Sequence, residues 1–335
     1  MTNTPAVFQV HFVRVLLISA AMLGLNACGH ALAPGFAIET QSAVVELREG
    51  PSQAELVAPT RIVILGTGTP IPDPHRAGPS IAVIHRGESY LFDVGAGSVH
   101  NATVARYKYD IPSLYPTQIG HVFLTHMHSD HTLDLVEAAY TMWWRRPSGL
   151  AVYGPSGIAE MVEGMHKMMA PDTRIRMSGT QPIQNADGYQ VNVTEIESGV
   201  VLEKDGIKIE AFAVNHGDVR PAFGYKITTA DRSIVISGDT AVSPELQKMA
   251  AGVDVLIHEV ISDTGLASNS AGFQAYHKRS HTPASDLGRL ADNAKPGLLV
   301  LYHGLYYGEA ESLIVDEVKA TYSGDVILAE DLDIL

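Results

Sequence analysis

A stretch of six residues that begins at His126 and ends at His131 constrains this chain more than any other part of it. The stretch reads His-Met-His-Ser-Asp-His and closely follows the apolar run 122–124. Alternate residues of an extended segment point the same way, so His126 and His128 can reach one ion, while Asp130 and His131 lie where the chain must turn and can serve a second. Imidazole and carboxylate groups are ligands of Zn²⁺ and similar ions. A polar loop that collected four such side chains by chance is the alternative, and the spacing favours a metal site after a buried strand.

Several other apolar runs of the chain also lead to polar residues. The polar residues that end or follow these runs are Asp93, His216, Asp239 and His303. We predict strands at 60–65, 81–85, 90–94, 122–124, 151–155, 207–214, 234–237, 253–258, 298–302 and 326–328, and helices at 132–144, 158–169 and 283–293. Strands that deliver polar side chains to one edge of packed sheets are typical of an α/β site. The sequence therefore predicts an α/β fold with a site at the strand ends.

The composition narrows the class of protein. The chain has 335 residues, of which 46% are hydrophobic and 18% charged, as expected for a globular enzyme with a large core. Its net charge is −14, and no run of five or more Lys and Arg residues occurs. Phosphate backbones are held by dense Lys and Arg, so we expect no nucleic-acid partner. A small anionic substrate is not excluded.

The N-terminus has the pattern of an export signal. Arg14 is the only charged residue among residues 1–27, and an apolar run at 15–25 follows it, which is too short to cross a bilayer comfortably. Cys28, the only cysteine, follows Leu-Asn-Ala in a segment that resembles a bacterial lipobox. We predict a lipoprotein signal peptide at 1–27, a tether at 28–59, a folded domain at 60–335, and an exported, periplasmic protein that lipidated Cys28 anchors to a membrane. A simple secretory signal and an uncleaved anchor are the alternatives.

Over roughly residues 60–335, the order of these motifs resembles the metallo-β-lactamase-fold hydrolases, whose pattern is His-x-His-x-Asp-His followed by a His, an Asp and a last His. The resemblance implies a hydrolase domain with an αββα four-layer sandwich, in which two packed mixed sheets are flanked by helices. It also implies two divalent metal ions, with Zn²⁺ as the default and Mn²⁺ or Fe as alternatives. Carried over to this sequence, His126, His128 and His216 hold one ion, Asp130, His131 and His303 hold the other, Asp239 bridges them with a hydroxide between, and Asp93 supports the site.

Within that family the chain looks most like the ribonuclease Z and arylsulfatase branch. The matching segments are 65–70, 221–225, 256–259 and the pair His281-Thr282. The resemblance implies that Glu259 orients His281 near the leaving group. The logic of two-metal hydrolysis adds Asp130 as a group that accepts a proton from the attacking water. A plain helix-start role is the alternative for His281, and a structural role is favoured for His258.

One departure from the ribonuclease Z pattern concerns tRNA. In that branch a tRNA-clamping arm is commonly inserted beyond the His that corresponds to His216. Here His216 and Asp239 are only 23 positions apart, which leaves no room for the arm. Because an acidic, exported protein would also not meet pre-tRNA, we reject tRNA processing.

Three functions remain. The first is an exported binuclear-metal hydrolase that cleaves small phosphodiester or aryl sulfate esters by attack of a metal-bridging hydroxide. The second keeps the metals but hydrolyses a lactone, thioester or β-lactam, with Tyr302, Tyr306 or Tyr307 assisting. The third is a lipoprotein that keeps the fold for binding or metal storage. The expected partner is a small-molecule ester, and a homodimer is left open.

Two groups of residues have no firm assignment. The segment 143–146, Trp-Trp-Arg-Arg, either lines a substrate entrance or ends a helix with basic residues against its dipole. Eight histidines lack a ligand context and are interpreted as surface, signal or loop residues: His11, His30, His75, His85, His100, His121, His166 and His277.

Overall fold

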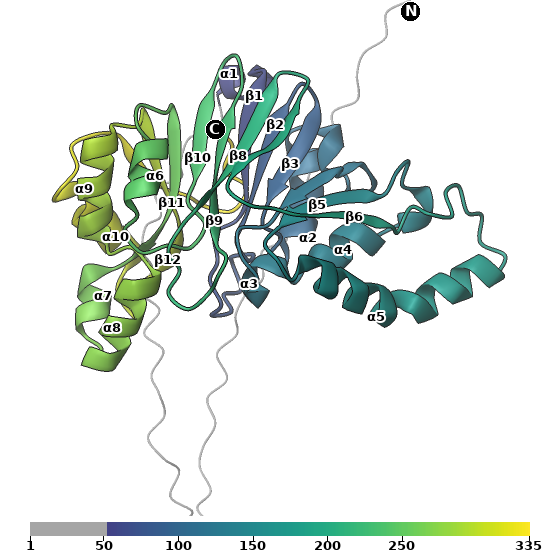
Figure 1. Ribbon diagram of the computed structural model, residues 1–335. Helices are drawn as coiled ribbons and strands as arrows, with labels where there is room; N and C mark the ends of the chain where they lie inside the picture. Colours follow the sequence, from purple (N-terminus) through teal and green to yellow (C-terminus); the bar gives the residue numbers. More distant parts are fainter. Residues whose placement is uncertain (1–51) are drawn as a thin grey trace, which may run out of the picture. The chain divides into compact units, whose positions relative to one another are not determined.

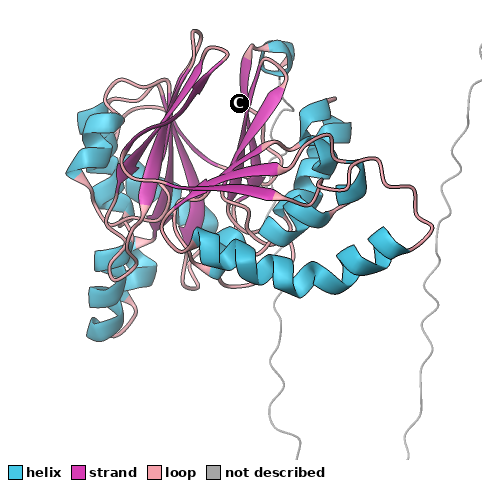
Figure 2. Cartoon of the chain, turned by 45° about the vertical axis from the view of Figure 1, so that its right-hand side comes forward, coloured by secondary structure: helices cyan, strands magenta, loops and turns pink. Residues whose placement is uncertain are grey.

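The computed structural model describes residues 52–335, which form two stacked β-sheets with helices on both outer faces (Figures 1 and 2). The first sheet has the order β1-β2-β3-β4-β5-β6, and the second β13-β12-β11-β10-β9-β8-β7. The strands of the first sheet are β1 (Thr60–Gly66), β2 (Ser80–His85), β3 (Glu88–Phe92), β4 (His121–Phe123), β5 (Leu150–Gly154) and β6 (Val191–Glu195). Those of the second are β7 (Gly199–Lys204), β8 (Ile207–Ala213), β9 (Phe223–Thr228), β10 (Ser233–Ile236), β11 (Val255–Ile261), β12 (Leu298–Leu305) and β13 (Val326–Leu328).

The helices lie mainly in the connections between parallel strands. They are α1 (Gln53–Val57), α2 (Ser98–Lys108), α3 (Ser129–Thr132), α4 (Leu135–Tyr140), α5 (Ile158–Ser178), α6 (Pro244–Met249), α7 (Asp263–Ala267), α8 (Ala271–Ser280), α9 (Ala284–Ala294) and α10 (Glu311–Lys319). Three short 3₁₀ turns, Pro112–Leu114, Pro116–Gln118 and Trp143–Arg145, complete the set. Among residues 52–335, no helix combines the length and the apolar character needed to cross a membrane.

The side chains between the two sheets form the central core. In β1, alternate residues divide between the two faces: Ile62 and Ile64 point into this core, while Val63 and Leu65 face the helices. The second sheet contributes residues such as Tyr225 and Ile257 to the same cluster. Because these strands are buried on both faces, they read as nearly continuous apolar runs.

Each outer face of the sheets is covered by helices. On the first sheet, α2, α4 and the first half of α5 supply buried side chains such as Ala102, Ala138 and Val162. On the second sheet, α6, α9 and α10 supply Leu246, Leu287 and Val318. The four-layer αββα arrangement predicted from the sequence is therefore confirmed.

The connectivity brings the carboxyl ends of parallel strands to a common region. In the first sheet, β3, β4, β5 and β6 pair in parallel, and in the second sheet β10, β11, β12 and β13 do so. The outer strands of each sheet, β1–β2 and β7–β9, pair antiparallel. Loops that follow parallel strands share one edge of their sheet, which is where α/β proteins build their sites.

The structure differs from the sequence prediction in several elements. The helix predicted at 132–144 is wrong as a single helix, because Thr141 is extended and Met142 is left-handed (φ 52°), and the segment is divided into α3, α4 and a 3₁₀ turn. Leu133, expected on its buried side, is 57% exposed. Strands β6, β7 and β9 and helices α2, α6, α7, α8 and α10 were not predicted. The predicted signal peptide and Cys28 lie outside the described residues, and the predicted tether contains α1.

Candidate metal centre

Seven side chains that lie in or after strands of both sheets gather in one region, next to the carboxyl ends of the parallel strands. His126 and His128 follow β4, Asp130 and His131 lie in α3, His216 follows β8, Asp239 follows β10, and His303 lies within β12. They form two groups in which the possible ligand atoms lie within 4.8 Å of one another: His126, His128, His216 and Asp239, and Asp130, His131 and His303. The structure thus brings together all the residues that the sequence suggested as ligands.

The first group directs three imidazole nitrogens at one point. Nδ1 of His128 lies 3.0 Å from Nε2 of His126 and 3.2 Å from Nε2 of His216. Nδ1 of His216 bonds to the backbone carbonyl of Ser280 at 2.8 Å, so this nitrogen carries the proton and Nε2 has a free lone pair. Such an arrangement suits a cation that accepts several imidazole ligands.

The second group is linked to the first through Asp239. Oδ1 of Asp239 lies 3.4 Å from Nε2 of His131, while Oδ2 lies 3.8 Å from Nε2 of His216. Asp130 completes the second group, since its Oδ2 lies 3.4 Å from Nε2 of both His131 and His303. One carboxylate therefore has an oxygen beside each group, as a shared ligand requires.

The backbone at the centre adopts conformations that ordinary strands avoid. Asp93 and His303 have left-handed φ values of 58° and 47°. His303 is also the extra residue of a β-bulge, because Glu259 pairs with Tyr302 and the next pair joins Val260 to Gly304. A β-bulge changes the direction of a side chain, and this bulge lies at the residue whose side chain joins the ligand cluster, His303. Such strained positions cluster at functional sites.

Asp93 supports two of the proposed ligands, His131 directly and His126 through Thr125. Its Oδ1 accepts the backbone N–H of Thr125, and its Oδ2 accepts the Thr125 hydroxyl and Nδ1–H of His131, each at 2.8 Å. The Thr125 oxygen in turn lies 2.9 Å from Nδ1 of His126. These bonds hold the proton of both imidazoles on Nδ1 and leave the lone pair of Nε2 available to a metal ion. This is the supporting role expected of Asp93.

The electrostatics of the centre fit a cation. Burial, followed by the neighbouring His131, lowers the pKa of His126 well below its usual value, which keeps the ring neutral. Burial opposes ionisation of Asp239, but the charges of His303 and His131 outweigh it and hold the Asp239 pKa well below its usual value. Nε2 of His131 and Oδ1 of Asp239 are buried without a hydrogen-bond partner among the described residues. Burial lowers the pKa of His131, but the charges of Asp239 and Asp93 outweigh it and raise that pKa well above its usual value, so a metal ion at Nε2 would take the place of a proton. A neutral His126, an ionised Asp239 and buried polar atoms without a partner in the described part of the chain fit a divalent metal ion.

A buried pair, His281 and Glu259, lies beside the cluster. Nδ1 of His281 lies 3.4 Å from Oε2 of Glu259, and the ring of His281 lies 5.2 Å from that of His216. Oε1 of Glu259 accepts the backbone N–H of Thr282 at 2.8 Å, which fixes the carboxylate. Burial lowers the pKa of His281, but the nearby charge of Glu259 outweighs it and raises that pKa. His281 caps the end of α8 and precedes α9, so the predicted pairing and the helix-boundary position are both present.

His277 was missed as a neighbour of this pair. The interpretation of His277 as a surface or loop residue is wrong, since it lies in α8, is nearly buried, and stacks on His281 at 5.4 Å. Burial, with the charge of His281, lowers its pKa to about 4. The hydroxyl of Tyr307 lies 3.1 Å from its Nε2. The helical spacing of four residues from His277 to His281 was the signal available in the sequence.

Two further interpretations need correction. Trp143 and Arg146 do not line a substrate entrance, because both are buried and the Arg146 guanidinium donates to the backbone carbonyls of Pro116 and Ala138 at 2.7 Å. Trp144 instead lies under the guanidinium of Arg176. His85 is also buried rather than on the surface, and its Nδ1 bonds to Thr60 at 2.9 Å.

Comparison with known proteins agrees with this architecture. A family model described as a beta-lactamase superfamily domain matches residues 89–304. The ribonuclease Z of Mycobacterium marinum is 35% identical over 204 residues, which cover 60% of this chain and 70% of that protein. The zinc-bound PqqB structure from Methylobacterium extorquens has a TM-score of 0.61 at 17% identity, covering 82% of this chain and 99% of that one. A diphosphatase of the PhnP family has a TM-score of 0.58 at 18% identity, covering 82% and 97%.

Proposed function

Because the chain belongs to the beta-lactamase superfamily, a family of metal-dependent hydrolases, we propose that it cleaves small phosphodiester or aryl sulfate esters. The observation that carries the proposal is the buried pair of His281 and Glu259 beside the ligand cluster. An imidazole held by a carboxylate can protonate an ester leaving oxygen, a step that a poor alkoxide or aryloxide leaving group needs. The similarity to ribonuclease Z, an enzyme whose name states that it cleaves RNA, supports chemistry at phosphorus.

We propose that the centre holds two divalent ions, with Zn²⁺ as the first candidate and Mn²⁺ or Fe as alternatives. His126, His128 and His216 would hold one ion, Asp130, His131 and His303 the other, and Asp239 would be shared. When bound, two such ions lower the pKa of a water and neutralise the charge that develops on the ester. The zinc-bound neighbour of similar fold favours zinc.

Two residues of the chain are assigned the proton transfers, and a third residue positions one of them. Asp130 is 9% exposed but lines a cavity beside the ligand cluster, where its carboxylate can accept a proton from an attacking water. His281 donates to the leaving oxygen, and Glu259 holds His281 in place and stabilises its protonated form. We interpret Asp130 and His281 as catalytic residues and Glu259 as a positioning residue.

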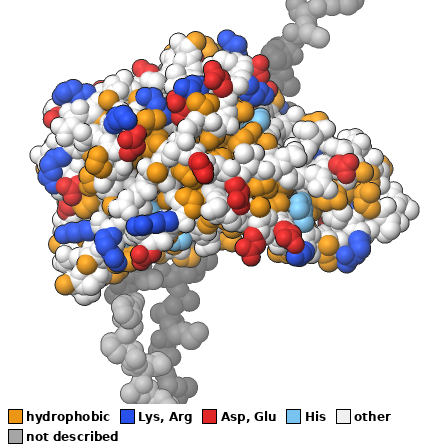
Figure 3. Space-filling model, viewed as in Figure 1, with side chains coloured by type: hydrophobic (Ala, Val, Ile, Leu, Met, Phe, Trp, Pro, Cys, Tyr) orange, Lys and Arg blue, Asp and Glu red, His pale blue; other side chains and the backbone are white. Residues whose placement is uncertain are grey.

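We propose that the substrate is small and is not tRNA. The described residues between His216 and Asp239 form only β9, β10 and their turns, with no inserted arm. Acidic and basic side chains are interspersed over most of the face shown in Figure 3. With a net charge of −14, such a surface offers little attraction to a phosphate backbone. We also propose that the protein is exported and anchored through lipidated Cys28.

A panel of chromogenic substrates tests the proposal. Zinc-loaded protein should hydrolyse bis-(p-nitrophenyl) phosphate or p-nitrophenyl sulfate, and His128→Ala should abolish that activity. His166→Ala serves as the matched control, because His166 lies on α5 and bonds to Tyr140 rather than to the cluster. Turnover of a lactone or β-lactam without turnover of either ester would replace the proposal with carbonyl hydrolysis. In that alternative Tyr306 and Tyr307, which line a cavity, could assist the reaction. Tyr302 could not, because it packs between the sheets.

A further inference from the structure

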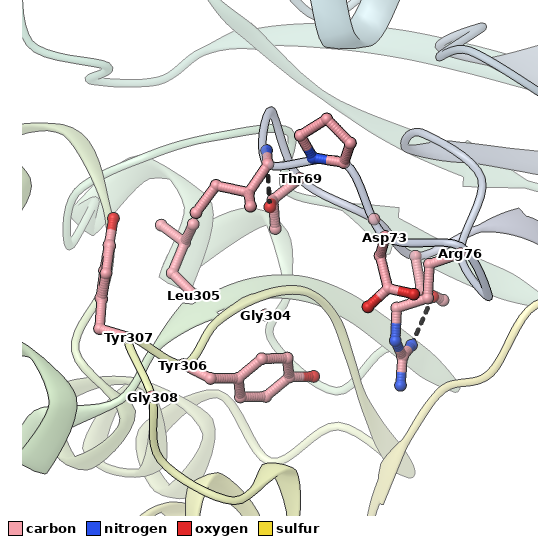
Figure 4. Close-up of a pocket in the computed structure, with 12 residues that line it drawn as sticks. Thr69, Asp73, Arg76, Gly304, Leu305, Tyr306, Tyr307 and Gly308 are labelled. Carbon is pink, nitrogen blue, oxygen red and sulfur yellow. Dashed lines mark hydrogen bonds between the residues drawn. The ribbon is translucent and has the colours of Figure 1, made fainter. Parts of the chain in front are cut away.

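Two cavities beside the metal centre share one loop. The first, of about 230 Å³, lies between the loop 67–76 and the segment 304–308 (Figure 4). The second, of about 300 Å³, reaches the ligand Asp130. Both are lined by Thr69, Ile71, Pro72, Asp73 and Arg76. Because these five residues line both cavities, we call the two together the groove, which reaches the ligand Asp130 and includes Gly304, the residue after the ligand His303.

The walls of this groove are largely apolar, and two of its residues are unusually exposed. Ile71 and Leu133 are 62% and 57% exposed, and both line the cavity that reaches Asp130. Leu305, Tyr306 and Tyr307 line the other cavity, and Figure 4 shows the ring of Tyr306 on the side opposite Thr69. Single exposed hydrophobic residues are common, but two that flank a proposed catalytic residue within one cavity indicate a binding surface.

The groove has no free positive charge that could hold an anion. Its only arginine, Arg76, donates to Oε2 of Glu311 and to the Thr67 hydroxyl, each at 2.6 Å. Asp73, on the same loop, adds a negative charge. A group that carries its own phosphate beyond the reacting centre would therefore find no partner among the residues that line the groove.

The loop that forms the groove is held in place by one aspartate. Asp331 accepts the backbone N–H and the hydroxyl of Thr67 through Oδ1, at 2.9 and 2.7 Å, and the backbone N–H of Ala77 through Oδ2, at 2.6 Å. Asn101 donates to the same carboxylate. Because both ends of the loop are fixed, its apolar residues face the groove before a substrate arrives, which reduces the entropy lost on binding.

We propose that this groove binds an uncharged apolar group of the substrate, such as an aryl or branched alkyl group, with Ile71 and Leu133 as specificity-determining residues. The inference rests on the proposed ester chemistry and narrows its substrate to esters that carry one charge at the reacting centre and an apolar group beside it. Transfer of an apolar group of that size from water into a preformed apolar groove increases affinity by roughly tenfold or more.

Calorimetric binding of two phosphodiesters to the full-length, zinc-loaded protein tests this inference. Diphenyl phosphate should bind at least about tenfold more tightly than dimethyl phosphate, since the two share their charge and differ in apolar surface. Leu133→Ser and Ile71→Ser should each weaken diphenyl phosphate several-fold and leave dimethyl phosphate unchanged. Val200→Ser is the matched control, because Val200 is 52% exposed on β7 and lines neither cavity.

The binding and hydrolysis readouts separate the two proposals. The groove proposal would be overturned by any of three results: equal affinity for the two diesters, binding of neither diester, or an aryl preference that both serine variants retain. A clear aryl preference in a protein that hydrolyses no ester would support the groove and refute the proposed chemistry. Hydrolysis with no preference would support the chemistry and refute the groove.

Discussion

Replacement of Asp93 by asparagine tests the assignment of the ligand cluster without touching a proposed ligand. In the native protein, the Asp93 carboxylate accepts three hydrogen bonds of 2.8 Å, two from Thr125 and one from His131. An amide oxygen can still accept from the Thr125 backbone. The amide NH₂, however, would face the Thr125 hydroxyl and Nδ1–H of His131, which are both donors.

The size of the effect follows from the protonation of two imidazoles. To avoid the clash of donors, His131 must move its proton to Nε2, and Thr125 must donate to Nδ1 of His126, which moves that proton as well. Both shifts block a nitrogen that is proposed to bind metal. Loss of such a supporting bond typically weakens metal affinity by about 10- to 100-fold, or roughly 1.4–2.8 kcal/mol.

Competition with a chromophoric chelator measures this change directly. Asp93→Asn should bind Zn²⁺ about 10- to 100-fold more weakly while its far-UV circular dichroism remains native. Asp134→Asn is the matched control, since Asp134 is also a buried aspartate but accepts from the Val99 backbone N–H at the start of α2. Native zinc affinity in folded Asp93→Asn would refute the ligand assignment.

Three further predictions concern separate parts of the molecule. Glu259→Gln should slow hydrolysis of esters with poor leaving groups by roughly 10²- to 10⁴-fold, because the substitution removes the charge that stabilises protonated His281. Hydrolysis of p-nitrophenyl esters, which have good leaving groups, should slow much less. An equal loss of rate across a leaving-group series would contradict the role of His281 as an acid. Arg146→Met should destabilise the fold by about 3 kcal/mol in chemical denaturation, since it leaves buried carbonyls unpaired, whereas exposed Arg145→Met should change little. Cys28→Ser should move the protein out of the membrane fraction, and a protein that stays there without attached lipid would refute the lipobox.

The parts of the site that the sequence predicted are those with a local signature. The cluster from His126 to His131 is contiguous, and His216 and Asp239 each follow an apolar strand at a glycine, so their positions at an open edge could be inferred. Gly238 shows why the glycine is needed: its φ is 59°, and a side chain there would meet the Phe223 carbonyl oxygen at 2.8 Å.

The parts that escaped prediction depend on contacts between distant segments. Asp331 stabilises a loop more than 250 residues earlier, and nothing in its own neighbourhood marks it. Arg146 stands in a polar-looking sequence, but its charge is satisfied by carbonyls that only the fold brings together. Strands β6 and β7 are half-exposed or exposed along most of their length, so they lack the apolar pattern that identified the other strands.

The division of the ligand set between the two sheets has a consequence for how the protein matures. Residues 126–131 follow the first sheet, whereas His216, Asp239 and His303 belong to the second. A folding intermediate that has formed only the first sheet offers four adjacent donors and binds an ion weakly, because the donors that close each coordination shell are still remote. With the metal centre proposed above, high-affinity uptake would require that the two sheets have docked, and bound ions would then oppose separation of the sheets. Metal binding would in that case stabilise only the folded state, and the chain would stay metal-free until its tertiary structure is complete.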